Sequence, residues 1–417
     1  MRETRDLEFK EAVSNSFLKT VSAFANYSGG RILFGVDDDG VVAGLPNPRQ
    51  ACLDIENKIN DSIAPQPSYS LAINEADSTV ELCVDPGVAK PYLYRAKAYK
   101  RNDSATIEVD NLELSRLLLE GRNMSFEELP ASEQSLSFDY MKSKIEVKLG
   151  LSEFSDDTLK TLGLQDASGI YNNAAAILAD SNDFPGIDVA VFGESISIIR
   201  QRLTSERQCV LKELDEVVGL FESVYCFEEV EGVERRRHEL IPLTAFREAV
   251  ANALVHRAWD MPAPIRVAMF DDRVEVSSPG GLPAGLTVEE YLNDMVSVRR
   301  NRITADVFLR LGLIEAFGTG ILRIKDTYSQ SFTKPQFKVS DNVVMVVLPV
   351  VREDLGLDGG ERAVYELLSN VRPKAASELE EGVTFGRSKL RRILKRLIAM
   401  DLAEEVGRGR GLKYRRR

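Results

Sequence analysis

Cysteine and histidine are scarce in this chain, and their scarcity excludes several classes of site. The 417 residues include four cysteines and two histidines, and no two cysteines lie close together in the sequence. A structural zinc site needs clustered cysteine and histidine ligands, so we do not expect one. The spacing gives no disulfide framework either.

Long apolar runs are also missing. The longest, residues 343–351, covers nine residues, whereas a membrane-spanning helix needs about 20. We therefore interpret it as a buried strand and expect no membrane partner. The amino terminus, MRETRDLEFKEAV, is charged and lacks the apolar core of a signal peptide, which predicts a cytoplasmic protein. No Gly-x-x-x-x-Gly-Lys-Ser/Thr loop occurs, so helicase motor activity is not expected.

Charge is unevenly distributed along a chain long enough for two to four domains. The net charge is −12. Residues 382–417 hold twelve Lys/Arg and three Asp/Glu, so this segment carries +9 and the remainder −21. An acidic body with a basic end is the pattern expected when one module meets a polyanion.

The first 120 residues predict a small α/β module. Phe17, Val21 and Phe24 recur at helical spacing before a Gly-Gly stop. The segments RILFGV and VVAGL flank DDDG, which predicts two strands and a turn, and residues 79–84 and 90–102 predict further strands. The last of these interleaves tyrosines with Lys/Arg, which suits contacts to phosphates and bases. The alternative is that the same residues form a solvated edge strand whose charges prevent pairing with other chains.

The motifs LEFKEA, AFANYSGG and GVDDDG together resemble the AlbA-like nucleic-acid-binding domain shared with Schlafen proteins. In the Schlafen branch, two glutamates and a later aspartate form a metal-dependent RNA-cleaving site. Glu3, Glu8 and Asp37 match them in order and rough spacing. The resemblance leaves two alternatives open: a binding module in which these acids are structural, or a ribonuclease in which they hold a divalent cation that activates water.

The stretch FREAVANALVHRAW, residues 246–259, poses the central question of the sequence. It predicts a helix with Glu248 and Asn252 four residues apart, and therefore on one face. Residues 264–286 follow as strand, Asp-Asp turn, strand and Gly/Pro loop. The acid and the amide either belong to a solvated face or form a site for a metal-bound nucleotide.

Four motifs in this region together resemble a divergent Bergerat-fold (GHKL-type) ATPase domain. They are REAVANALVHR, DRVEVSSPGGLPAGLT, RRNRI and LGLIEAFGTGILRI. The resemblance is to bacterial proteins described as transcriptional regulators or as RecG-helicase-related. It implies ATP and Mg²⁺ as cofactors, with Asn252 as the Mg²⁺ ligand and Glu248 as the general base that polarises water. Glycine backbone N–H groups would approach the nucleotide. Arg299, Arg300 and Arg302 would form a cationic lid, or alternatively belong to a solvated loop. The nucleotide-binding residues implied besides Asn252 are Gly280, Gly281, Gly318, Thr319, Gly320, Arg299 and Arg300.

One departure from that family pattern affects the expected ligand. The family uses an aspartate to bind the adenine amino group, and SSPGGLP places Ser277 or Ser278 there. A serine hydroxyl accepts this hydrogen bond more weakly than a carboxylate. The site could therefore bind another nucleotide or ligand, and the sequence leaves open whether it hydrolyses ATP. His256 is expected to be either a packed helix-end residue or a site residue, and Trp259 is expected in the core.

Residues 353–417 predict a winged helix-turn-helix, because three helical segments precede a β-hairpin with a Gly/Arg tip. In the third helix, residues 390, 393, 394, 397 and 398 form an apolar stripe, and the basic residues lie largely off it. Such a helix can enter the major groove while the wing meets phosphates. A structural or dimer-forming winged helix is the alternative. The expected DNA contacts are Arg387, Lys389, Arg391, Arg392, Lys395, Arg408, Arg410 and Lys413.

The sequence therefore predicts an α+β multidomain protein. Its parts would be an AlbA/Schlafen-like α/β domain (residues 1–120), a Bergerat-type α/β sandwich with a helical lead-in (121–352) and a winged helix-turn-helix (353–417). We expect a homodimeric transcriptional regulator that binds double-stranded DNA and a nucleotide or other ligand, with weak ATPase activity and RNA binding left open. The alternatives are a Schlafen-like ribonuclease acting on structured RNA and a non-catalytic DNA-binding scaffold.

Overall fold

The computed structural model divides the chain into two compact units. Unit 1 comprises Met1–Thr327 and Pro335–Val350, and unit 2 comprises Tyr328–Lys334 and Val351–Arg417. The structure describes residues 2–150, 154–231, 234–283, 286–293, 298–316, 318–351, 357–369, 372–407 and 409–416. Among them, no helix combines the length and apolar character needed to cross a membrane.

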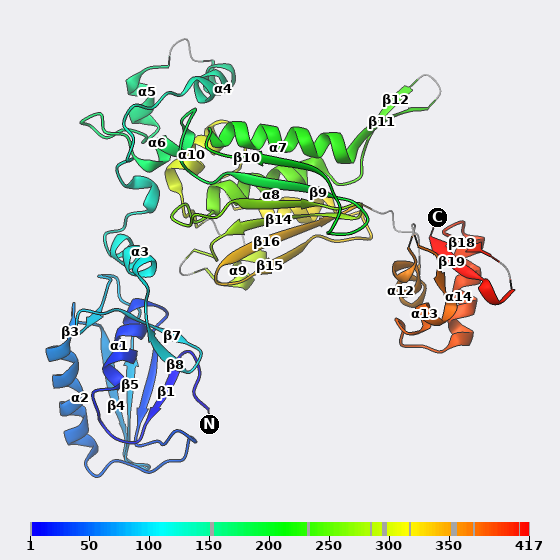
Figure 1. Ribbon diagram of the computed structural model, residues 1–417. Helices are drawn as coiled ribbons and strands as arrows, with labels where there is room; N and C mark the ends of the chain where they lie inside the picture. Colours follow the sequence, from blue (N-terminus) through cyan, green and yellow to red (C-terminus); the bar gives the residue numbers. More distant parts are fainter. Residues whose placement is uncertain are drawn as a thin grey trace. The chain divides into compact units, whose positions relative to one another are not determined.

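The amino-terminal part of unit 1 is built on a four-stranded sheet in the order β1-β2-β5-β4, with β1 and β2 parallel and the other pairs antiparallel. Helices α1 and α2 accompany this sheet (Figure 1), and α1 buries Phe17, Val21 and Phe24 as its spacing predicted. The elements are β1 (Leu7–Lys10), α1 (Phe17–Asn26), β2 (Gly30–Phe34), α2 (Pro48–Ser62), β3 (Ile63–Ala64), β4 (Tyr69–Asn74), β5 (Thr79–Val84), β6 (Leu93–Tyr94), β7 (Tyr99–Asn102), β8 (Ala105–Glu108) and α3 (Asn111–Gly121).

Two of the predicted strands in this part are wrong. Residues 90–102 form the separate strands β6 and β7, because Arg95 and Ala96 adopt positive φ of 50° and 60° and turn the chain between them. VVAGL is not a strand; only an isolated bridge joins Val36 to Val42. At its end Gly44 has φ +74°, a conformation that does not continue a strand.

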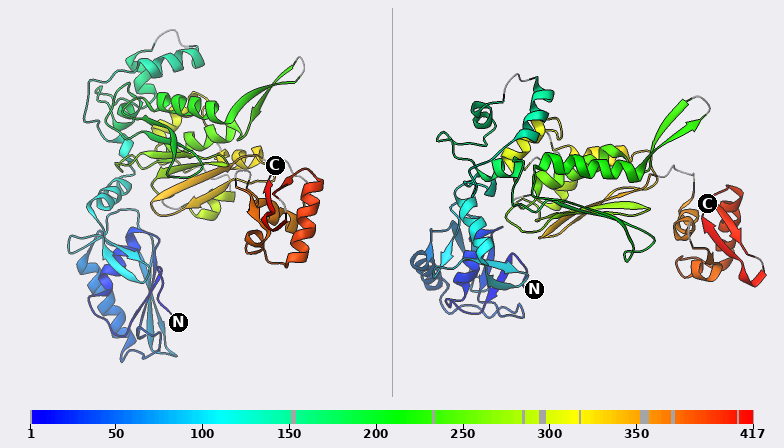
Figure 2. Two further views of the ribbon diagram at one scale, coloured as in Figure 1. Left: turned by 45° about the vertical axis from the view of Figure 1, so that its right-hand side comes forward. Right: turned by 45° about the horizontal axis from the view of Figure 1, so that its top comes forward.

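The middle of unit 1 is a six-stranded sheet in the order β10-β9-β13-β14-β16-β15, in which β9 and β13 are parallel and the other neighbours antiparallel. Helices α7 and α8 lie over one face of it (Figures 1 and 2). They pack through Phe221 and Phe246, whose stacked rings have centroids 3.9 Å apart. The elements are β9 (Ile187–Phe192), β10 (Ile199–Ser205), α7 (Val210–Tyr225), α8 (Leu243–His256), β13 (Ile265–Met269), β14 (Arg273–Pro279), β15 (Gln336–Val339) and β16 (Val343–Pro349).

Shorter helices surround this sheet, and one of them has an unusual cap. The buried Glu127 carboxylate accepts hydrogen bonds from the backbone N–H of Ile303 and from the N–H and hydroxyl of Thr304. It therefore satisfies the free N–H groups at the start of α10 from a distant part of the chain. The helices are η1 (Phe126–Glu128), α4 (Asp139–Leu149), α5 (Asp156–Thr161), α6 (Asn173–Leu178), α9 (Val288–Asn293), α10 (Arg302–Arg310) and α11 (Gly320–Thr327).

A two-stranded hairpin interrupts the helical region between α7 and α8. Strands β11 (Cys226–Glu231) and β12 (Glu234–Glu239) pair antiparallel, with Glu228 opposite Arg237. The hairpin extends away from the six-stranded sheet (Figures 1 and 2). Helix α7 ends at Tyr225, and the hairpin begins at the next residue, Cys226.

Unit 2 contains three helices followed by a β-hairpin, in the order the sequence predicted. Its core includes Val364, Leu390, Ile393, Leu394 and Leu397, so four of the five residues of the predicted apolar stripe are buried, and the fifth, Ile398, is partly buried. The strand β17 completes a three-stranded sheet in the order β17-β19-β18. The elements are α12 (Gly359–Leu367), β17 (Lys374–Ala375), α13 (Ala376–Glu380), α14 (Arg387–Ala399), β18 (Ala403–Val406), η2 (Gly409–Gly411) and β19 (Lys413–Arg416).

Candidate functional site

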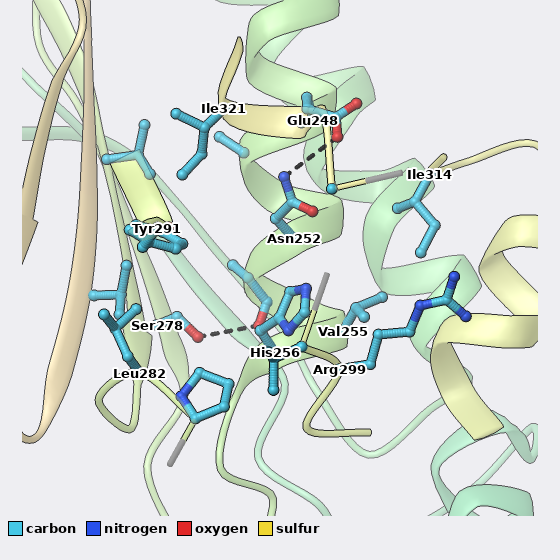
Figure 3. Close-up of a pocket in the computed structure, with 18 of the residues that line it drawn as sticks. Glu248, Asn252, Val255, His256, Ser278, Leu282, Tyr291, Arg299, Ile314 and Ile321 are labelled. Atoms are coloured by element: carbon cyan, nitrogen blue, oxygen red, sulfur yellow. Dashed lines mark hydrogen bonds between the residues drawn. The ribbon is translucent and has the colours of Figure 1, made fainter. Parts of the chain in front are cut away.

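A hollow lies in unit 1 between α8, α11 and the ends of β14 and β16. It holds about 1020 Å³ of empty space, counting the part that is open to solvent. Figure 3 shows Glu248 and Asn252 toward one end and His256 and Ser278 toward the other. Most of the remaining lining side chains are apolar: Val255, Val276, Leu282, Pro283, Leu286, Tyr291, Val298, Ile314, Ile321, Val344 and Val346.

Glu248 and Asn252 lie together on the face of α8 that lines this hollow. The Asn252 Nδ2 donates to Glu248 Oε1 at 3.3 Å, and the Glu248 residue is only 6% exposed. Burial raises the pKa of Glu248, while Arg323, whose Nη1 lies 3.9 Å from Oε2, and Asn252 oppose that rise. A raised pKa makes the carboxylate a better proton acceptor, so this arrangement suits a general base.

The start of α11 comes close enough to this pair that a Cβ at Gly320 would press on the ends of both side chains. A Cβ on Gly320 would lie 2.4 Å from Glu248 Oε1 and 2.6 Å from Asn252 Nδ2. The backbone N–H groups of a helix start carry partial positive charge and attract anions. Just before it, Gly318 has φ +66° and the Thr319 hydroxyl donates to Glu315 Oε2 at 3.2 Å. The predicted GTG segment therefore lies beside the predicted acid and amide.

Gly280 and Gly281 also line the hollow, but protein atoms occupy the space beside them. A Cβ on Gly280, which has φ +99°, would lie 2.3 Å from an Arg300 guanidinium nitrogen. One on Gly281 would lie 2.5 Å from the Asp341 carbonyl oxygen. Close packing within the protein therefore accounts for both glycines, whether or not a ligand approaches them.

Of the two candidate serines, Ser278 is the one that lines the hollow. It is 8% exposed, and its hydroxyl donates to the Ala253 carbonyl at 3.0 Å. With its proton engaged there, the Ser278 oxygen can act only as an acceptor toward a ligand.

The three arginines of the expected lid have different environments. Arg299 lines the hollow, and its guanidinium pairs with Asp306 at 2.6 Å. Arg300 donates to the carbonyls of His256 at 3.3 Å and Gly281 at 2.8 Å, so it supports the backbone. Arg302 is exposed, 3.4 Å from Glu128.

Sequence reasoning missed Arg323. It pairs with Glu315 and approaches Glu248, so it links α11 and the segment before it to the acid on α8. Its position three residues after Gly320 was the available signal, because that spacing places both on neighbouring parts of one helix face.

The amino-terminal carboxylates have structural partners. Glu8 is 5% exposed and forms ion pairs with Lys10 and Arg101, both at 2.6 Å, and accepts a hydrogen bond from the Thr20 hydroxyl at 2.5 Å. The charge of this carboxylate is therefore already balanced by two cations.

Glu3 and Asp37 bind backbone groups instead. Glu3 Oε1 accepts from the Phe9 N–H at 2.8 Å, and Asp37 Oδ1 accepts from the N–H groups of Asp39 and Val41 in a turn. Glu3 and Glu8 line one polar hollow together with Asp38, which sequence reasoning did not single out, and Asp37 is not among its lining residues. Within the described residues, no group of three or more His, Cys, Asp or Glu is placed to hold a metal ion.

The basic residues of α14 lie on its exposed side. Arg387 lies 3.8 Å from Glu380, and Lys389 lies over the Phe385 ring at 4.8 Å. Within the part of the chain that the structure describes, Arg391, Arg392 and Lys395 have no ion-pair partner. Lys413 is exposed on β19, Arg408 lies outside the described residues, and Arg410 is described only as part of η2.

Two family models match parts of unit 1. Residues 3–110 match the Schlafen AlbA_2 family, and residues 263–348 match the family described as "Putative ATP-dependent DNA helicase recG C-terminal". Both resemblances predicted from the sequence are thereby confirmed. The chain is an α+β multidomain protein with a Schlafen-type AlbA domain and an ATPase-like domain of the RecG-related kind.

Two solved structures show the level of similarity to this chain, and no curated protein matches it. The DIP2311 protein from Corynebacterium diphtheriae is 18% identical, covers 99% of this chain and 95% of its own, and has a TM-score of 0.48. The N-terminal domain of a "Putative ATP-dependent DNA Helicase RecG-related Protein" from Nitrosomonas europaea is 23% identical over 25% of this chain and 79% of its own, with a TM-score of 0.19. With TM-scores below 0.5, neither similarity supports an inference about the fold or the function of this chain.

Proposed function

We propose that the hollow of unit 1 binds a magnesium-complexed nucleotide and that the protein is a DNA-binding transcriptional regulator. The observation that carries the first part is the joint placement of Glu248 and Asn252 against Gly320, where a Cβ would meet both side chains. The RecG-type ATPase match to residues 263–348 supports the same interpretation.

The polar end of the hollow fits a magnesium-bridged phosphate group. Since Asn252 Nδ2 donates to Glu248, the amide oxygen remains for a cation, and oxygen is the ligand atom that Mg²⁺ prefers. The N–H groups at the start of α11 would bind phosphate oxygens. When bound, Mg²⁺ would balance the phosphate charge, and Glu248 would accept a proton from water.

The opposite end fits an uncharged aromatic ring. Leu282 and Val344, which stands opposite Ser278 on β16, supply apolar surface there, and Ser278 supplies a neutral hydrogen-bond acceptor (Figure 3). Ligand sites commonly combine such an apolar lining with a few fixed polar groups.

Calorimetric titration of ATP, ADP and GTP with Mg²⁺ tests the site. We expect binding by the wild type and at least a tenfold weaker Kd in Asn252→Ala, a loss of about 1.4 kcal/mol. Asn60→Ala, on α2 of the AlbA domain, is the matched control and should bind as wild type does. Unchanged affinity in Asn252→Ala would contradict the site, and no heat with any nucleotide would favour the scaffold alternative.

For unit 2, we propose that the exposed side of α14 contacts double-stranded DNA. The support is a set of exposed cations, Arg391, Arg392 and Lys395, which have no ion-pair partner among the described residues and lie beside a buried apolar stripe. Such cations release counterions from DNA on binding. The winged-helix interpretation and the homodimer remain predictions.

Salt-dependent binding of duplex DNA tests this surface. Changing Arg391, Arg392 and Lys395 to Gln should reduce the slope of log Kobs against log[salt] by about 0.9 for each phosphate that the variant no longer neutralises. Lys338→Gln, an exposed change in unit 1, should leave the slope unchanged. Deleting residues 355–417 should abolish most binding; a truncated protein that binds equally well would refute the proposal.

The ribonuclease alternative receives less support, because Glu8 is already paired with Lys10 and Arg101. It remains testable. It requires Mg²⁺- or Mn²⁺-dependent cleavage of structured RNA that Glu8→Ala removes, and intact RNA in the presence of either metal would exclude it.

A further inference from the structure

The face of α8 that carries Glu248 and Asn252 continues to His256. The three residues stand at i, i+4 and i+8, and all three line the hollow. Figure 3 shows the His256 imidazole inside the hollow, on the far side of Asn252 from Glu248. A repeat of four residues keeps side chains on one helix face, so α8 presents an acid, an amide and an imidazole in a row.

The next residue, Arg257, turns the other way. It is fully buried, donates to the Ala263 carbonyl at 2.6 Å and lies 4.1 Å from the centre of the Trp259 ring. The His-Arg pair at the end of α8 is therefore divided between the hollow and the core. Packing explains the arginine and the tryptophan, but it does not explain the histidine.

The imidazole of His256 is uncharged and has hydrogen-bonding capacity to spare. Burial, with Arg300 and Arg299 nearby, lowers the pKa of His256 to about 4, so near pH 7 one ring nitrogen is a donor and the other an acceptor. Within the described residues, neither nitrogen has a hydrogen-bond partner; the Arg300 bond goes to the His256 carbonyl. A partly buried imidazole without a partner lining a hollow is available to a ligand.

The surroundings of His256 select the chemistry of that ligand. The Ser278 oxygen, an acceptor, lies toward the same end of the hollow as His256, together with Leu282 and with Val344, which stands opposite Ser278 on β16 (Figure 3). Two neutral hydrogen-bonding groups in an apolar setting suit the edge of a flat, uncharged heterocycle. The nearest cations are already engaged, Arg299 with Asp306 and Arg300 with the carbonyls of His256 and Gly281. The phosphate-compatible groups are at the other end, beside Gly320.

We propose that His256 forms a hydrogen bond to the base of the bound nucleotide and is a specificity-determining residue of the site. The inference rests on the proposed nucleotide function and assigns the base to the His256 end of the hollow. It makes the acid, the amide and the imidazole of α8 three contacts to successive parts of one ligand.

The scarcity of histidine makes a direct test possible. The chain has two histidines, and the second, His238, lies on the β12 hairpin strand, so imidazole NMR signals of the full chain report one site and one internal control. Adenosine should shift the His256 signals and leave those of His238 unchanged. Tripolyphosphate with Mg²⁺, which lacks a base, should leave His256 unshifted.

Variants separate a contact from a structural role. His256→Phe retains a flat ring but cannot form a hydrogen bond, so ATP affinity should fall about three- to tenfold, whereas affinity for Mg²⁺-tripolyphosphate should not change. His256→Gln should recover part of the loss, and His238→Phe should have no effect. A thermal melt of each variant shows that it is folded.

The outcomes distinguish this inference from the function on which it rests. If no nucleotide binds the wild type, the proposed function fails and His256 has no such ligand. If the wild type binds ATP and Asn252→Ala does not, yet His256→Phe and His256→Gln both bind ATP as the wild type does, the site stands and the assignment of the base to His256 is wrong.

Discussion

Gly320→Ala should destabilise the protein and impair the hollow, although alanine normally favours a helix. In an open helix position the change stabilises by about 0.5–1 kcal/mol. At Gly320 the added Cβ would lie 2.4 Å from Glu248 Oε1 and 2.6 Å from Asn252 Nδ2, so the ends of both side chains must move. Glu248 is only 6% exposed and is hydrogen-bonded to Asn252, so this movement breaks that bond and overpacks the site, at a cost of about 1–3 kcal/mol. We expect a net loss of about 1–2 kcal/mol.

Gly219→Ala is the matched control. Gly219 lies within α7, and nothing lies within 4 Å of its added Cβ. Urea unfolding should therefore show a gain of about 0.5–1 kcal/mol for Gly219→Ala and a loss for Gly320→Ala. Titration with Mg²⁺-nucleotide should show at least a tenfold weaker Kd for Gly320→Ala alone, because Asn252 is displaced. If both variants gain stability equally and bind nucleotide as wild type does, the geometry argued for the hollow is wrong.

Three other changes have definite expected outcomes. The pKa of His256 is lowered from 6.5 to about 4 in the folded protein, so between these two pH values only the unfolded chain binds the proton. The free energy of unfolding should therefore fall by up to about 3 kcal/mol as the pH drops from about 6.5 to about 4. Urea unfolding measured at each pH should show that His256→Gln lacks this contribution to the fall. Glu127→Ala should cost about 2–4 kcal/mol in the same assay, since it leaves buried N–H groups at Ile303 and Thr304 without an acceptor; a change under about 0.5 kcal/mol would contradict the capping role. Glu248→Gln should retain nucleotide binding within about threefold, since the amide keeps its shape, and should lose any hydrolysis seen in a phosphate-release assay; persistent hydrolysis would exclude Glu248 as the base.

Local periodicity predicted the parts of the site that one helix carries. The four-residue spacing placed Glu248 and Asn252 on one face of α8, and the apolar stripe of α14 is buried as expected. Both depend only on the geometry of a single element. The family resemblances predicted the identity of two whole domains, because the motifs that carry them are short and contiguous in the sequence.

Long-range partners could not be predicted in the same way. Glu8 meets Arg101, which is 93 residues away in the sequence, so its ion pair depends on the tertiary fold. The adjacent Arg299 and Arg300 read alike in the sequence, yet one pairs with Asp306 and the other with backbone carbonyls. The turn at Arg95 gave no glycine signal, because its positive φ falls on a residue that rarely adopts it.

The β11–β12 hairpin is rich in charged residues on both strands, and their order helps to fix how the strands align. Glu228 stands opposite Arg237. A slip of two residues would keep every side chain on its own face of the ribbon, so the apolar pattern alone would not oppose it. In one direction that slip would bring Glu228 opposite Glu239 and move it away from Arg235, with which it now pairs at 3.7 Å. Charge thus gives this ribbon a preferred alignment that it could not obtain from a hydrophobic core.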